Sequence, residues 1–501
     1  MRLQRVPLLC LSTLISIVGL VCDLRAQTTP PSPSSPWSPP GLKSYEKDLA
    51  NRRPSEGAAK IDPDKVYDLP ALIDIAERTN PETRIAWESA RQAASAVGLS
   101  ESAYFPSLAA SAGAGYARAF IPFPVLQQGP GPKEVSIVGG GSLPFDLESA
   151  NVALDMKWLL FDFGERKASK TVAEERLMAA NVGFNAVHQQ IVFAVARRYY
   201  EFNSSRQKVE AAESSQKAAQ TVSESVRARL EHGLATRPEG LQAEQEAALA
   251  AFDLEAARGA MSDALVELVA SLGIPPTTKL QVAALPERSF PDETESLEDL
   301  ISRALVQRPD LVAKLSNVRA SRAAVQGARA AYYPKFVLEG TVGWLGLSMR
   351  VASTPFFGAG QAVYGGSILV SVPVFDGFAR RENLRTAESE LQASEDELAH
   401  SQDSVMQQVW KARTQVDTAL RKLDSAEKLV AASESAYAAS LEAYHHGLGT
   451  YVEVANAQRS VASARSVMVD TRSAVHISLT SLALAVGDLA RPAPNPGGHQ
   501  K

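Results

Sequence analysis

The stretch His232-Gly233-Leu234-Ala235-Thr236 decides the fold, because it returns 214 residues later as His446-Gly447-Leu448-Gly449-Thr450. Phe161-Asp162 and Phe375-Asp376 form a second matched pair at the same spacing. Matches that keep their order and their spacing are the signature of an internal repeat. The chain of 501 residues is therefore predicted to contain two copies of one structural unit.

The beginning of each copy matches at a different spacing. Asn80-Pro81-Glu82 corresponds to Arg308-Pro309-Asp310, which lies 228 residues further on. The difference, 228 − 214 = 14, places 14 additional residues in the first copy, between Pro106 and Phe161. One longer loop between two strands would explain them.

Each copy is expected to be mainly helical. It begins with an Ala-rich helical segment, at 69–104 or 297–332. Proline is absent from 145–237 and from 374–491, and the glycine turns divide these stretches, which predicts one very long helix in each copy, over about 164–232 and 378–446. At 1.5 Å per residue, each would be roughly 100 Å long. A helix of this length indicates a coiled coil or a tube.

Short runs between the helical segments alternate apolar and polar residues. This period of two predicts strands, and therefore a sheet with two different faces. The runs are roughly 9 to 11 residues long, the length that crosses a membrane in a tilted barrel. Aromatic residues gather at their ends, as in an interfacial girdle. A half-buried sheet in a water-exposed domain is the alternative. The apolar residues expected to face lipid are Leu154, Met156, Trp158, Leu338, Val342, Trp344, Ile368, Val370 and Val372.

The number of strands has a consequence for assembly. Four strands cannot close a barrel, and an open sheet edge cannot lie in lipid. If this sheet is in a membrane, several chains must share one barrel, and three chains would supply twelve strands.

The two ends of the chain differ in composition from the rest. Arg2 and Arg5 precede an apolar run of roughly 6–21, and Leu24-Arg25-Ala26 follows as a cleavage site, which predicts a secretory signal peptide over 1–26. Cys10 and Cys22 both lie within it, so cleavage would leave a chain without cysteine. Lipidation at Cys22 is the alternative. The predicted organisation is signal peptide 1–26, Pro/Ser-rich disordered lead-in 27–60, repeat 61–275, linker 276–296, repeat 297–489 and disordered tail 490–501.

Taken together, these motifs resemble the TolC-like outer-membrane efflux family. The resemblance covers about 66–489 and rests on the duplicated plan, the Asn80-Pro81 and Arg308-Pro309 helix starts, and both glycine turns. It also rests on the Tyr-Phe-Pro and Tyr-Tyr-Pro stretches before the first strand of each copy, at 104–106 and 332–334. It implies a mainly α fold with a small transmembrane β part. Duplicated long-helix hairpins would form an α-barrel, and four β-strands per chain would contribute to a shared 12-stranded trimeric β-barrel.

The resemblance also implies partners and sites. The implied protein is a homotrimer in the outer membrane that extends into the periplasm and docks a periplasmic adaptor, which links it to an inner-membrane pump. The adaptor-docking tips would include Arg229, Gly233, Leu234, Thr236, Gly447, Leu448 and Thr450. The gate candidates are Tyr444 and Glu453, together with Asn456 where some members carry a second acid, and Glu239 as the counterpart of Glu453 in the first copy. A ring of three close carboxylates in a narrow pore would disfavour anions.

Nothing in the sequence indicates an enzyme, a metal site or a cofactor. Asp162-Phe163-Gly164 spells a kinase motif without its partner motifs, and Asp162 is expected to cap a helix instead, as Asp376 would. The formal net charge of −5 does not favour electrostatic binding to the phosphates of nucleic acid. The expected function is the passive exit duct of a tripartite efflux or secretion system. The alternative is an elongated periplasmic or surface coiled-coil structural protein or adhesin.

Overall fold

The computed structural model describes residues 42–51, 61–128, 131, 135–285 and 295–489. It divides the chain into two units, Met1–Ala58 and Ala59–Lys501, which we describe separately. The expected signal peptide with both cysteines, and the expected tail at 490–501, lie outside the described residues. Among the described residues, no helix combines the length and the apolar character needed to cross a membrane.

The first unit contains helix α2, Leu42–Asn51, inside the segment that was expected to be disordered. The Pro/Ser-rich composition stops at Gly41, and the ten residues that follow contain no proline. They are mostly Leu, Lys, Glu and Ala, which have high helix propensity. The composition of 27–41 therefore does not extend over the whole segment.

In the second unit, each copy opens with two helices where one helical segment was expected. The break falls at Asn80 and Arg308, whose backbones are extended (ψ 127° and 125°) because each precedes a proline. Asn80 then caps the next helix, since its side-chain oxygen accepts the N–H of Glu82 at 2.9 Å. The four helices are α3 Leu69–Thr79, α4 Pro81–Ser102, α7 Leu297–Gln307 and α8 Pro309–Ala330.

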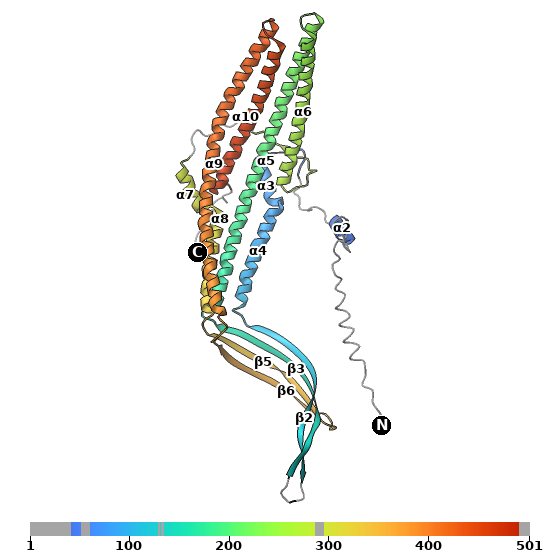
Figure 1. Cartoon of the computed structure of the whole chain (residues 1–501), viewed down its shortest axis with the longest axis vertical. Coiled ribbons are helices and arrows are strands. Elements are labelled where there is room, and N and C mark those ends of the chain that lie inside the picture. The colour runs from blue at the N-terminus through green and yellow to red at the C-terminus, as the bar shows by residue number, and fades with distance from the viewer. Residues whose placement is uncertain (1–41, 52–60, 129–130, 132–134, 286–294, 490–501) are drawn as a thin grey trace. The chain divides into compact units, whose positions relative to one another are not determined.

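The long helices have the predicted length. Helices α5, Glu165–Glu231, and α9, Ala379–His445, contain 67 residues each, which corresponds to roughly 100 Å. Each turns back into a shorter helix, α6 Arg237–Ser271 or α10 Tyr451–Val486. Figure 1 shows these two hairpins side by side, with the turns at one end of the unit and the strands at the other.

The strands form one antiparallel sheet in the order β2-β3-β5-β6. They contain 22, 27, 17 and 15 residues, so they are longer than expected. The 14 additional residues of the first copy lengthen the paired strands β2 and β3 rather than a loop. The full length of these strands is not visible as alternation of apolar and polar residues, because many positions are Ala or Gly. The main-chain hydrogen bonds between strands form whatever the side chain is. The bounds are β2 Ser107–Gln128, β3 Val135–Phe161, β5 Lys335–Val351 and β6 Phe357–Ser371.

Two equivalent cores hold the middle of this unit together. Leu72, Ile191 and Leu268 belong to the first core, and Leu300, Val405 and Leu482 belong to the second. Their spacings are again 228 for the first pair (300 − 72) and 214 for the other two (405 − 191 and 482 − 268). The first core is completed by two short parallel strands, β1 Val66–Tyr67 and β4 Gln281–Val282, the latter inside the expected linker 276–296. The duplication is therefore visible in packing as well as in sequence.

The joint between the sheet and each long helix has an unusual backbone. Two consecutive residues adopt the left-handed conformation, Phe163 (φ 53°) and Gly164 (φ 100°) in the first copy. In the second copy they are Gly377 (φ 66°) and Phe378 (φ 70°). A left-handed residue other than glycine costs about 1–2 kcal/mol, so each joint contains one strained phenylalanine.

Candidate functional sites

The sheet has one apolar face, and the strand register determines which residues lie on it. Leu154 pairs with Val342, which pairs with Tyr364 on the next strand. Paired residues of neighbouring strands share a face, and so do alternate residues of one strand. This register brings eight of the nine residues expected to face lipid onto a single face, namely Leu154, Met156, Trp158, Leu338, Val342, Trp344, Ile368 and Val370.

Val372 is the exception. Strand β6 ends at Ser371, which pairs with Lys335, the first residue of β5. Pro373 has no N–H to donate to a further ladder, and Pro334 precedes β5. Val372 is exposed but lies one residue beyond the sheet, so the strand register does not assign it to a face and its lipid contact stays a prediction.

The opposite face carries two polar rows, followed by an apolar row of Leu159, Val337 and Leu369 at the end of the sheet nearest the helices. The hydroxyl of Thr341 donates to the Asp155 carboxylate at 2.8 Å. One row nearer the helices, the Lys157 ammonium lies 3.7 Å from the Glu339 carboxylate. A sheet with one apolar face and with polar and charged rows on the other fits a boundary between lipid and water.

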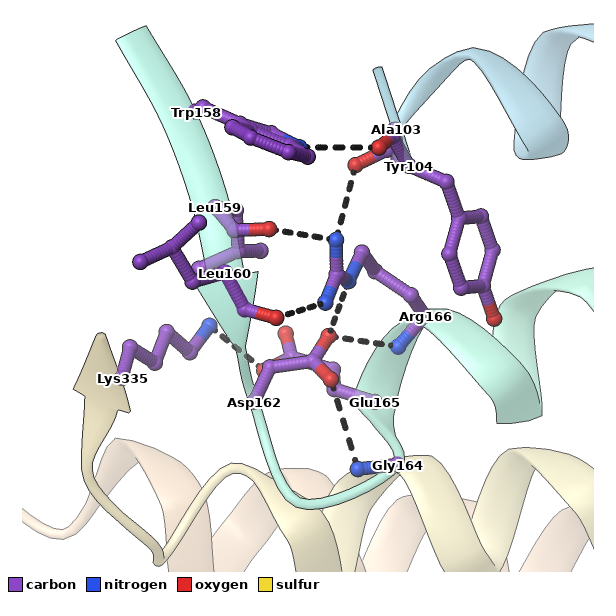
Figure 2. A network of polar contacts seen from close by, with 10 residues as sticks. All are labelled: Ala103, Tyr104, Trp158, Leu159, Leu160, Asp162, Gly164, Glu165, Arg166 and Lys335. Carbon is purple, nitrogen blue, oxygen red and sulfur yellow. Dashed lines mark hydrogen bonds and ion pairs between the residues drawn. The ribbon is translucent and has the colours of Figure 1, made fainter. Parts of the chain in front are cut away.

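Arg166 ties the end of the sheet to the start of α5 (Figure 2). Its guanidinium donates to the main-chain oxygens of Ala103, Leu159 and Leu160 and to the carboxylate of Asp162. Asp162 also accepts the N–H of Arg166 at 2.8 Å, and Asp376 accepts the N–H of Arg380 at 3.1 Å in the second copy. The expected capping role of both aspartates is thus confirmed. Among the described residues, the guanidinium of Arg380 hydrogen-bonds to Asp376 alone.

The turns between the long and short helices are built alike in the two copies. Gly233 (φ 74°) and Gly447 (φ 75°) adopt the left-handed conformation that ends a helix. The next residues, Leu234 and Leu448, are 69% and 85% exposed, so an apolar side chain stands free at each turn. We call these two turns, 232–236 and 446–450, the tips.

Two of the expected gate carboxylates are used in helix caps. Glu239 accepts the N–H of Thr236 at 2.7 Å, and Glu453 accepts the N–H of Thr450 at 2.9 Å. Each threonine hydroxyl in turn accepts the N–H of its glutamate, which completes a capping box. The structure therefore gives both glutamates and both threonines a local role in starting α6 and α10.

Tyr444 lies between the two hairpins rather than on a free surface. It is 5% exposed and packs in a cluster with Val226 of α5, Ala243 of α6 and Tyr451 of α10. The Arg229 guanidinium lies 4.8 Å from the centre of the Tyr444 ring and donates to the main-chain oxygens of Tyr444 and His445. Arg229, which was expected to dock a partner, thus joins the ends of the two long helices.

Polar contacts continue this junction along α10. Arg459 Nε donates to the Glu246 carboxylate of α6 at 3.0 Å, and Arg459 Nη1 donates to Asn456 at 3.2 Å. Burial raises the pKa of Tyr451 to about 12, with a further contribution from the Glu246 charge. Burial also raises the pKa of Tyr444, and the nearby Glu239 carboxylate adds to this. Sequence reasoning missed Tyr451, Arg459 and Glu246, because only the fold brings α6 and α10 together.

Comparison with known proteins gives a consistent result. Residues 72–274 and 300–488 match the sequence profile of the family described as Outer membrane efflux protein. The chain is 28% identical to Protein CyaE of Bordetella pertussis over 331 residues, 66% of this chain. That match spans 65% of the length of Protein CyaE, just under two thirds.

Solved structures share the fold. A membrane protein from Pseudomonas aeruginosa superposes with a TM-score of 0.70 at 20% identity, over 94% of this chain and 99% of that one. The open state of the Neisseria gonorrhoeae MtrE outer membrane channel superposes with a TM-score of 0.68 at 23% identity, over 85% of this chain and 91% of that one.

Proposed function

Because this chain belongs to the outer membrane efflux protein family, we propose that it is the passive exit duct of a tripartite efflux or secretion system. The observation that carries the proposal is a two-faced sheet joined directly to two helices of 67 residues. The sheet has the faces required of a membrane barrel wall, and the helices are long enough to reach deep into the periplasm.

The proposed functional unit is a homotrimer. Strands β2 and β6 are the two edges of the sheet, and their outer main-chain groups have no strand partner within the described residues. Such edges cannot face lipid unpaired, so β2 of one chain pairs with β6 of the next. Three chains close a barrel of twelve strands, and the same symmetry arranges the helical hairpins around a common axis.

The proposed partner of the tips is a periplasmic adaptor, which links the duct to an inner-membrane pump. In both tips an exposed leucine follows a left-handed glycine. Each tip therefore presents one apolar side chain on a defined backbone turn. Adding a side chain at Gly447 meets no atom within 4 Å, and only the backbone conformation opposes it. The substitution Gly447→Val therefore disturbs the tip selectively.

The proposed gate is the junction formed by Arg229 and Tyr444. Their contact holds the ends of α5 and α9 together, so separating the hairpins requires breaking it. Two buried polar atoms there, Arg229 Nε and Tyr444 Oη, lack hydrogen-bond partners among the described residues. Unsatisfied groups make a contact weaker than a fully bonded one. The carboxylates of Glu239 and Glu453, which cap the starts of α6 and α10, add negative charge near this junction.

The duct is tested by locating the native assembly. We expect heat-modifiable trimers in outer-membrane fractions; a protein recovered only as a water-soluble monomer, as a free coiled-coil protein would be, refutes the proposal. Adaptor coupling is tested with Gly447→Val, which should form normal trimers but lose export in cells. Gly259→Ala, in the interior of α6 and equally open, is the matched control. Normal export by Gly447→Val would rule out docking at the tips.

A further inference from the structure

A buried carboxylate and two arginines form a cluster on three neighbouring strands. Asp146 of β3 is 3% exposed at its side chain, whereas Arg118 of β2 and Arg350 of β5 are 49% and 33% exposed. Arg118 donates to both carboxylate oxygens, at 2.5 and 3.0 Å. Arg350 donates to Oδ2 through Nε at 2.9 Å, and the hydroxyl of Tyr116 donates to Oδ1 at 2.8 Å.

This cluster has positive charge and donors to spare. One carboxylate balances one of the two guanidinium groups. The Nη1 amino group of each arginine makes no hydrogen bond to any described residue, although it belongs to a partly exposed side chain. Arg350 is also held 4.4 Å from the centre of the Phe356 ring. Two guanidinium groups held by Asp146, each with an amino group that bonds to no described residue, are a preorganised site for a further anion.

The register places the cluster on the apolar face of the sheet, just beyond its apolar rows. Arg350 pairs with Asp146, and it lies eight residues along β5 from Val342, at the middle of the apolar rows. At about 3.4 Å per residue and a tilt near 40°, this is roughly 20 Å along the membrane normal. The hydrocarbon core ends about 15 Å from the midplane and the head groups extend to about 22 Å. The cluster therefore lies at head-group depth, at the end of the sheet away from the helices.

We propose that Arg118 and Arg350 bind the phosphate of a lipid head group in the outer leaflet. The proposal rests on the proposed membrane position of the sheet. Planar guanidinium groups match phosphate oxygens in a bidentate way, and basic sites at this depth bind anionic head groups. Glu148 shares this face one row nearer the apolar rows and makes no ion pair with a described residue. Its charge repels the phosphate from that side and directs it onto the arginines.

The test uses the full-length trimer in detergent and native mass spectrometry. The probes are bisphosphorylated lipid A and its dephosphorylated form. We expect the wild type to retain the phosphorylated lipid at least tenfold better. The double variant Arg118→Gln/Arg350→Gln should lose this preference, and Glu148→Gln should increase it. Arg322→Gln, an exposed arginine of α8 paired with Glu395, is the matched control and should change nothing.

Several results would overturn the inference. They are equal retention of both lipids by the wild type, an unchanged preference in the double variant, or complete displacement of the lipid by millimolar inorganic phosphate, which would indicate a free-anion site. If the double variant does not form trimers, Arg118→Gln alone keeps the Arg350–Asp146 pair and should still weaken retention. Failure of the wild type to form membrane trimers would refute the proposed function instead.

Discussion

Val342 offers the sharpest test of the two-faced sheet. It lies on β5 midway between Phe336 and Ser348, in the middle of the apolar rows, and it is exposed in the single chain. Its neighbour Thr341 faces the opposite side and bonds to Asp155. The substitutions Val342→Lys and Thr341→Lys therefore place the same charge on the same strand, one residue apart, on the two faces.

The expected penalties differ strongly. A lysine on the lipid face near the midplane costs about 2–4 kcal/mol, and a trimer contains three copies, so Val342→Lys should destabilise the assembly by about 6–12 kcal/mol. Thr341→Lys places its ammonium beside the Asp155 carboxylate on the polar face. Exposed pairs of this kind contribute about 0–1 kcal/mol, so little change is expected.

The assay is urea denaturation of the trimer in lipid vesicles, followed by the shift between folded and heat-denatured bands. We expect a large fall in the denaturation midpoint for Val342→Lys, or no membrane trimers at all, and a midpoint near that of the wild type for Thr341→Lys. Equal tolerance of both lysines would mean that neither face meets lipid. Greater sensitivity at Thr341 would show that the faces are assigned the wrong way round.

Two further predictions concern the joint and the tips. Arg166→Ala leaves three main-chain oxygens without their side-chain donor and removes the guanidinium from the Asp162 carboxylate, which keeps the N–H groups of residues 164 and 166, and the change should cost about 3–5 kcal/mol. Arg380→Ala loses a single carboxylate partner, so thermal unfolding should show a clearly smaller effect, and equal effects would contradict the role of the carbonyl contacts. At alkaline pH, Tyr451 keeps its proton longer when folded, because its pKa is about 12 against 10 when unfolded. Stability should be unaffected below pH 10 and should fall by up to about 2.7 kcal/mol as the pH rises to 12. Tyr451→Phe should remove this part of the alkaline loss in a urea titration, and an unchanged pH profile would argue against burial of the hydroxyl.

The features that the sequence predicts well are those marked by local chemistry. Proline and glycine define the ends of the long helices, so α5 and α9 lie within a few residues of the expected ranges. Strand length was underestimated because pairing depends on the backbone of the neighbouring strand. The two-residue strands β1 and β4 are too short to show any periodicity.

The polar networks were missed for a different reason. Asp146 and Arg350 are 204 residues apart, and only the register of β3 with β5 brings them together. The partners of Arg166 are mainly carbonyl oxygens, which every residue carries and which leave no trace in a sequence. Glu453 shows the converse case, because its spacing from Thr450 matches a capping box as well as a gate.

The strained joints indicate what the two halves of the chain have kept since they diverged. At the repeat spacing of 214, Phe163 aligns with Gly377 and Gly164 aligns with Phe378, so both positions read as substitutions. The backbone is nevertheless the same, with two left-handed residues in a row, and the glycine has only changed places with its neighbour. At this joint the two copies have therefore kept the backbone conformation and not the amino-acid identity at each position. A search for distant relatives that allows either order of glycine and phenylalanine here would detect duplicated chains that position-by-position scoring penalises twice.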